Sequence, residues 1–260
     1  MTTRPMPAVT PAGVGAALRN ALPSFIAEAF SLRLYIVLVA AAIAISYSTY
    51  LVFDASAVIA LGREDGVFEY VTVVCFLVAS AVFFFAWRES GNAFFLLLAL
   101  ALFVGAGEEI SWGQRLIGFA TPQALASVNA QQEFNLHNLA AINPRDMTGE
   151  YKQGIARLLT VNFVYKLFWL GFGVLIPLAV RINRVAAYVA GRFQFPVAAL
   201  PIGVLFVVNW LVYRLTMSLL QTGEDPHYYA AAMEIQEALS ALVFMMLAFW
   251  FLKAETRRPA

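Results

Sequence analysis

Cysteine and histidine are scarce in this sequence. The chain has 260 residues, with one cysteine, Cys75, and two histidines, His137 and His227. A single cysteine excludes an intrachain disulfide, a CxxC redox pair and a cysteine zinc cluster. Because Cys75 lies within an apolar run, we interpret it as a buried packing residue. Metal or acid–base chemistry would therefore rely on the two imidazoles and on carboxylates.

Charge is also sparse, because only 13% of the residues are charged, 61% are hydrophobic and the mean hydropathy is +0.74. So little polar surface cannot cover a soluble globule of this size. The net charge of +1 is not the strongly basic balance expected of a nucleic-acid-binding protein. The composition predicts an integral membrane protein whose partners are membrane lipids, with no nucleic-acid partner.

Long apolar runs predict an all-α fold, because a bilayer-crossing helix needs about 20 apolar residues. We expect a disordered tail and an interfacial amphipathic helix, interrupted at Pro23, over residues 1–33. A single transmembrane domain should cover 34–252, with a cytoplasmic tail over 253–260. The predicted spans are 34–53, 67–87, 93–110, 159–181, 197–220 and 230–252.

Arginine and lysine in the short connections predict the orientation of the chain. With six spans, one side holds the basic residues Arg4, Arg19, Arg33, Arg88, Arg181, Arg184, Arg192, Lys253, Arg257 and Arg258. The other side holds the acidic or mixed segments 62–66, 111–158 and 221–229. We therefore expect a multi-pass protein with both termini in the cytoplasm.

Polar residues within the spans gather toward the predicted outer side. They include Glu69, Glu108, Glu109, Asn162, Lys166, Asn209, Arg214, Glu234 and Glu237. A charge in hydrocarbon costs at least about 2.5 kcal/mol, so several at one depth indicate a shared polar cavity. The alternative is that the glutamates only form ion pairs with Arg115, Lys166 and Arg214 that fix helix packing.

The segment "GAGEEISWGQRLIG" (105–118) places two adjacent glutamates at the end of a very apolar run. If the helix continues through residue 115, Glu108, Ser111, Trp112 and Arg115 share one face. Glu109 then points about 100° away. The two carboxylates need not serve one partner.

The segment 119–158 is the longest connection, and we expect it to fold as a structured loop over the outer surface. Thr121 followed by Pro122 predicts a short helix with Thr121 as its N-cap. "QQEFNLHN" (131–138) then delivers His137 within hydrogen-bond or one-water reach of the paired glutamates. Asp225 before Pro226 predicts the N-cap of the last helix, with His227 in its first turn.

Three segments carry a resemblance: "REDGVFEYVT" (63–72), "GEEISWGQRLIGFATPQAL" (107–125) and "NLHN" (135–138). In this order they resemble a group of bacterial multi-pass membrane proteins with EDGxxE, GEEISWGQR and NLHN segments and no established activity. The resemblance covers roughly 60–140 and implies a bacterial inner-membrane location. It also implies one constellation of Glu64, Asp65, Glu69, Glu108, Glu109, Gln114, Arg115, Asn135, His137 and Asn138.

These patterns favour an enzyme of the outer leaflet that hydrolyses or transfers a group on a lipid or lipid-linked substrate. The candidate catalytic residues are Glu108, Glu109 and His137. The candidate substrate-binding residues are Arg115, Lys166, Arg214, Trp112 and Gln114. A divalent metal such as zinc is a candidate cofactor, with the ligand set Glu69, Glu108, His137, His227 and Glu234.

Two other classes fit the same residues. Buried glutamates and a lysine could relay protons or bind a cation, as in a transporter. Against this, the inner halves of the spans offer no polar path and the chain shows no internal repeat. Alternatively, the protein is a non-catalytic assembly or lipid-binding subunit whose acidic cavity recognises a basic segment of a partner.

Overall fold

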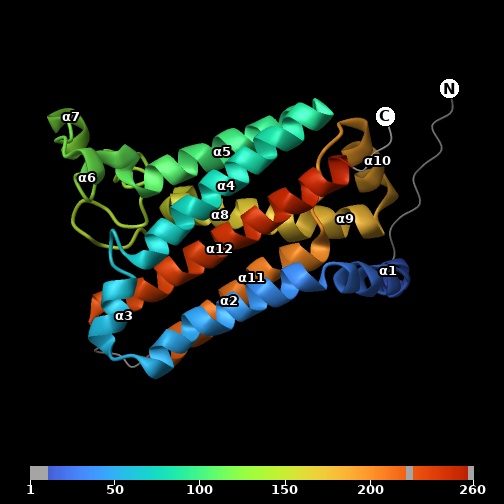
Figure 1. The fold of residues 1–260 in the computed structure, drawn as a ribbon, viewed down its shortest axis with the longest axis horizontal. Coiled ribbons are helices and arrows are strands. Elements are labelled where there is room, and N and C mark those ends of the chain that lie inside the picture. Colours follow the sequence, from blue (N-terminus) through green and yellow to red (C-terminus); the bar gives the residue numbers. More distant parts are fainter. Residues whose placement is uncertain (1–10, 221–224, 257–260) are drawn as a thin grey trace.

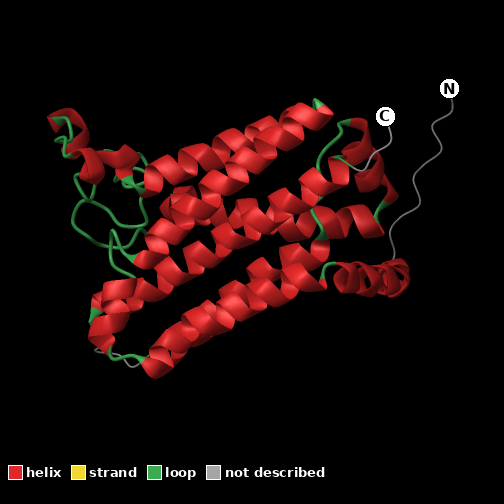
Figure 2. Cartoon of the chain, viewed as in Figure 1, coloured by secondary structure: helices red, strands yellow, loops and turns green. Residues whose placement is uncertain are grey.

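The computed structural model describes residues 11–220 and 225–256. Over these ranges the regular structure is helical, with two isolated β-bridges, Asn129–Leu139 and Arg145–Tyr151 (Figure 2). The all-α prediction is confirmed. The predicted tail at 1–10 and the end of the predicted C-terminal tail at 257–260 lie outside the described residues.

Within the described residues, five helical runs are long and apolar enough to cross a membrane, and a bent helix pair can supply a sixth. The five are α2 (Arg33–Val52), α4 (Val67–Ser90), the continuous run α8–η3–α9 (Val161–Ile182), α11 (Leu200–Leu219) and α12 (Pro226–Glu255). The sixth joins α5 (Ala93–Glu109) to the segment Ser111–Ile117. Helices therefore cover the six predicted segments, five of them as single long apolar runs and one as the bent pair.

The two ends of the bundle differ in the elements that they carry (Figure 1). At one end lie α3 (Ala55–Leu61), α6 (Gln114–Ile117), α7 (Gln123–Ala126) and the long connection after α7. We call this the loop end. At the opposite end, the basic end, lie α1 (Pro11–Ser31), α10 (Arg184–Arg192) and the C-terminal turns of α12. The predicted separation of acidic loops from basic ones is therefore confirmed.

The core forms around α12, which packs against α4, α11, α2 and α3. Phe244 of α12 lies 4.7 Å from Phe206 of α11 between ring centroids, and both rings are fully buried. Small residues allow close helix contact in membranes. The closest approach joins α11 to the π-helical segment η3 (Gly171–Leu175), where a Cβ on Gly203 would lie 1.7 Å from the carbonyl oxygen of Gly173.

A buried polar network links α2, α11 and α12 near the middle of the bundle. The Asn209 amide donates to the Gln236 carbonyl at 2.8 Å and to Ser240 Oγ at 3.2 Å. Tyr47 Oη donates to Asn209 Oδ1 at 3.3 Å. Asn209 is fully buried, so these bonds satisfy its amide where no water reaches it. Asn209 was predicted to line a polar cavity, but these contacts indicate that it joins the helices by interhelical hydrogen bonds.

Two local predictions are wrong. Helix α1 continues through Pro23 instead of being interrupted there, because a proline removes one backbone hydrogen bond without necessarily ending a helix. Thr121 does not cap α7, which begins at Gln123 with no side-chain cap. Thr121 Oγ1 instead accepts a hydrogen bond from the Gln114 side chain at 2.7 Å.

Candidate functional site at the loop end

The helix that carries the paired glutamates ends at Glu109, so the shared face that a helix continuing to Arg115 would have given does not form. Ser111, Trp112 and Gly113 have φ values of 47°, 54° and 79°, and the chain bends by 63°. The left-handed conformation costs a non-glycine residue roughly 1–2 kcal/mol. Tertiary contacts offset this cost, because the fully buried Ser111 donates to Glu133 Oε2 at 2.7 Å.

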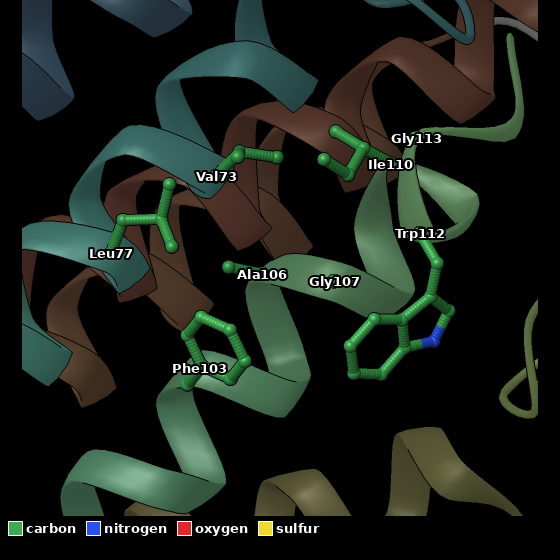
Figure 3. Close-up of a pocket in the computed structure, with 8 residues that line it drawn as sticks. All are labelled: Val73, Leu77, Phe103, Ala106, Gly107, Ile110, Trp112 and Gly113. Atoms are coloured by element: carbon green, nitrogen blue, oxygen red, sulfur yellow. The ribbon is translucent and has the colours of Figure 1, made fainter. Parts of the chain in front are cut away.

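The bend folds Trp112 back over the end of α5. Its Nε1 donates to Glu108 Oε1 at 2.7 Å, and its ring lies so close to Gly107 that a Cβ there would be 2.9 Å away. Beside the ring is a cavity of about 190 Å³ (Figure 3). Its walls are the apolar residues Val73, Leu77, Phe103, Ala106, Ile110 and Trp112, with Gly107 and Gly113.

Arg115 lies at the centre of a cluster of acidic side chains. Its Nη2 lies 2.7 Å from Glu69 Oε1, and its Nε lies 2.9 Å from Asp65 Oδ1. Nη1 pairs with Glu133 and lies 3.8 Å from Glu64 Oε2. We call these residues the Arg115 cluster. The Arg115 guanidinium is occupied by protein carboxylates, so the arrangement does not support the predicted role of Arg115 in substrate binding.

The Arg115 cluster carries more negative than positive charge. Four carboxylates surround one guanidinium. Partial burial and then the nearby Glu133 carboxylate raise the pKa of Glu64, while Arg115 opposes the shift. The cluster joins three segments that are far apart in the sequence: the loop before α4, the bend after α5 and the loop at 131–138.

Glu108 holds the NLHN segment. Its Oε2 accepts backbone N–H bonds from Leu136 at 2.6 Å and His137 at 2.8 Å, in addition to the Trp112 bond to Oε1. His137 Nδ1 lies 3.5 Å from the same Oε2. The predicted closeness of His137 to the paired glutamates is therefore confirmed. With its oxygens already occupied, Glu108 is better suited to positioning His137 than to exchanging a proton.

Buried asparagines keep the loop in place. Asn135 donates to Ser111 Oγ at 2.9 Å and to Glu133 Oε2 at 2.8 Å, and Asn129 donates to the Asn135 carbonyl at 2.9 Å. Asn129 and Asn135 are almost fully buried, as is Asn138. Asn129 and Glu133 are structural residues of this site whose roles the sequence pattern does not predict. A polar run between turns was the available signal, but it does not show which amides are buried.

Glu109 faces a second acidic group, which it forms with Glu234 and Glu237 of α12. Each of these partly buried carboxylates interacts electrostatically with another member of the group. None of the three makes a hydrogen bond or ion pair with any residue that the structure describes. We call them the inner glutamates. These three carboxylates are therefore not engaged in holding the described part of the fold together.

Helix α8 brings a phenol and an amine toward the inner glutamates. The Tyr165 hydroxyl is buried, and it interacts electrostatically with Glu237 and Glu109. Lys166 interacts electrostatically with Glu237 and, repulsively, with Arg214. His137 also interacts electrostatically with Glu237. His137 therefore contacts Glu108 and interacts electrostatically with one inner glutamate, Glu237.

The remaining candidate site residues either hold the loop in place or lie on the exposed surface. Gln114 donates to Thr121 and accepts from the backbone N–H of Phe134 at 2.7 Å, so it braces the loop. Arg214 and His227 are both exposed. Asp225 accepts the backbone N–H of His227 at 2.8 Å, which confirms its predicted role as the N-cap of α12.

The structure does not assemble the predicted metal ligands. Among the described residues, no three or more His, Cys, Asp or Glu side chains are arranged to hold a metal ion. Glu69 is bound to Arg115. His227 and Glu234 are seven residues apart on α12, which corresponds to about 10 Å along a helix. The residues of this site therefore do not fit a metal centre.

Comparison with known proteins adds no assignment. No protein-family model, curated protein or solved structure matches the chain. The functional interpretation therefore rests on the arrangement of His137, Glu108 and the inner glutamates.

Proposed function

We propose that this protein is a membrane enzyme that uses acid–base catalysis to hydrolyse, or transfer a group on, a lipid or lipid-linked substrate. The observation that carries the proposal is the position of His137. Its Nδ1 lies 3.5 Å from Glu108, which the fold holds in place, and His137 also interacts electrostatically with Glu237, a carboxylate without a hydrogen-bond partner among the described residues. Nucleophile activation by a histidine that a carboxylate orients is a recurring catalytic arrangement.

His137 is the proposed general base. A carboxylate beside Nδ1 favours the tautomer that carries its proton on Nδ1, which leaves Nε2 free to accept a proton. The Nδ1–Oε2 distance of 3.5 Å is long for a hydrogen bond, but such bonds commonly shorten when substrate binds. His137 would take the proton of a water or hydroxyl group as its oxygen attacks the substrate.

Glu237 is the proposed general acid, because it is the inner glutamate that interacts with His137 and Lys166. Neighbouring carboxyl groups in a low-dielectric site can keep a proton between them. The protonated member would give its proton to the leaving group as the bond to the substrate breaks. Lys166, which interacts electrostatically with Glu237, and the exposed Arg214, which interacts with Lys166, are the candidate contacts for an anionic head group.

The cavity beside Trp112 supports a substrate with a hydrocarbon chain. Its walls carry no ionisable side chain, and it lies on the same bend as Glu108. An acyl chain in this cavity would hold the head group near the loop end. In this proposal the loop end faces the outer leaflet of a bacterial inner membrane, and both termini are cytoplasmic. The basic residues at the opposite end support that orientation.

The test is to incubate the purified protein, reconstituted in nanodiscs, with a bacterial membrane lipid extract. Mass spectrometry then compares the lipids before and after incubation. We expect His137→Ala to slow product formation by at least about 100-fold, the usual scale of general acid–base catalysis. His227→Ala is the matched control, because His227 is exposed and lies outside the site. Equal product from the wild type and His137→Ala would refute the proposal.

The inner glutamates favour one alternative, the binding of a proton or cation for transport. Three carboxylates without hydrogen bonds to the described residues could serve that role as well as catalysis. The two functions differ in their need for His137. A transporter would lose ion uptake in Glu237→Gln and keep it in His137→Ala, whereas the enzyme would lose lipid turnover in both variants.

A further inference from the structure

A second cavity lies at the basic end, far from the site described above. It has a volume of about 390 Å³ and lies between α1 and the corner where α9 (Ile176–Ile182) meets α10. Arg181, Asn183, Arg184 and Ser24 supply its polar groups. Ala21, Val180, Ile182 and Ala187 supply apolar surface. A cavity lined by both basic and apolar residues suits an amphipathic ligand with an anionic group.

The charges of this cavity are only partly balanced. Arg181 forms an ion pair with Glu28 of α1. Arg184 is exposed and makes no hydrogen bond or ion pair with the residues that the structure describes. The Asn183 side-chain oxygen caps α10 by accepting the backbone N–H of Val185 at 2.8 Å. Two guanidinium groups and one carboxylate leave a net charge of +1 at the cavity.

The cavity lies at the end of a helix that is long and apolar enough to cross a membrane, where lipid head groups are expected. Arg181 is the last residue but one of the membrane span Val161–Ile182, so it marks the end of the apolar stretch. Helix α1 packs against α9 and α11 at this end, and it forms one wall of the cavity. Basic pockets at the cytoplasmic ends of membrane helices commonly bind lipid phosphate groups.

We propose that this cavity binds the phosphate group of an anionic phospholipid. Arg184 and the donors of Arg181 not paired with Glu28 contact the phosphate oxygens, and the apolar wall contacts the glycerol and upper acyl chain. The net charge of +1 matches a singly charged phosphodiester better than a doubly charged phosphomonoester. The site is independent of the proposed catalytic function, because its residues belong to the opposite end of the bundle.

The test measures thermal unfolding of the full-length protein in a neutral detergent. One series adds phosphatidylglycerol, a second adds phosphatidylcholine and a third adds inorganic phosphate. We expect only phosphatidylglycerol to raise the melting temperature. Arg184→Gln should weaken its apparent affinity by about fivefold, which corresponds to the loss of one arginine near a phosphate.

Arg88→Gln is the matched control, because Arg88 is an exposed arginine at the same end but outside the cavity. It should keep the wild-type affinity. Unfolding in phosphatidylcholine alone reports whether each variant is folded, and Arg184→Lys gives a second variant that keeps the charge but loses paired hydrogen bonds. Equal losses in Arg88→Gln and Arg184→Gln, or no loss in Arg184→Gln, would overturn the site. Equal stabilisation by inorganic phosphate would overturn the lipid assignment.

Discussion

Glu108 and Glu109 are neighbours in the sequence, yet the fold treats them differently. Glu108 accepts three hydrogen bonds, two of them from the NLHN backbone. Glu109 turns toward Glu234 and Glu237 and makes no such bond with the described residues. The same contrast separates the Arg115 cluster from the inner glutamates. The carboxylates that are paired stabilise the structure of the loop end, and the unpaired ones are the candidates for proton transfer.

The largest expected loss of stability comes from Arg115→Ala. The change removes the one cation shared by four acidic side chains, and Glu69 is almost fully buried. Leaving a buried charge without its partner costs about 3–5 kcal/mol, and the partial exposure of Arg115 puts the expected value near the lower limit. Chemical unfolding in detergent measures the loss. Arg63→Ala, at an exposed arginine on the loop that carries Glu64 and Asp65, should change stability by less than about 0.5 kcal/mol.

The next prediction compares the adjacent glutamates directly. Glu108→Gln keeps the shape but weakens hydrogen bonds to a charged acceptor, so we expect a loss of about 1.5–3 kcal/mol. Glu109→Gln removes a charge that has no partner, so its stability should be unchanged or higher. The two melting curves, recorded under the same conditions, supply the comparison. A larger destabilisation in Glu109→Gln would reverse the assigned roles.

Gly107→Ala tests the bend through packing alone. A Cβ at this position would lie 2.9 Å from the Trp112 ring, so the ring must move. Overpacking of this kind costs about 1–3 kcal/mol. Because the ring also borders the apolar cavity, the emission spectrum of Trp112 should shift as well. A variant with wild-type stability and emission would show that Trp112 does not pack against Gly107.

The smallest effect concerns the pH dependence of the Arg115 cluster. The pKa of Glu64 is raised from its ordinary 4.5 by partial burial and by Glu133. Its contribution to stability is therefore fully present below the unfolded pKa and is lost as the pH rises through the folded pKa. Glu64→Gln removes this loss, so its stability relative to the wild type should increase as the pH rises above 4.5. Melting temperatures recorded between pH 4 and pH 7, roughly the range over which a moderately raised carboxyl titrates, check this sign.

Much of the fold follows from hydropathy and from the distribution of basic residues. Six apolar runs and the positions of arginine predict the spans and the elements at each end, because the bilayer imposes length and charge rules on every helix. The cap at Asp225 also follows from local chemistry, since Asp before Pro is a strong helix start. The helix break at Ser111 does not, because contacts with Glu133 and Asn135 hold its left-handed backbone.

The different roles of Glu108 and Glu109 could not be predicted from the sequence either. The pattern shows that Glu108 and Glu109 point in different directions, but the donors that fix Glu108 are backbone N–H groups of Leu136 and His137. Every residue except proline carries such a donor, so no residue type marks it. The predicted metal ligands do not come together among the described residues, because Glu69 forms an ion pair with Arg115. The two residues are far apart in the sequence, so this ion pair is seen only in the folded structure.

The most direct test of the central contrast measures stability and lipid turnover together in Glu237→Gln. The variant keeps the shape of an inner glutamate and removes its charge and its proton. The account predicts a melting temperature equal to or above that of the wild type, with turnover of the lipid substrate reduced by at least about 100-fold. Unchanged turnover, or a melting temperature as low as that of Arg115→Ala, would show that the inner glutamates serve the fold and not the chemistry.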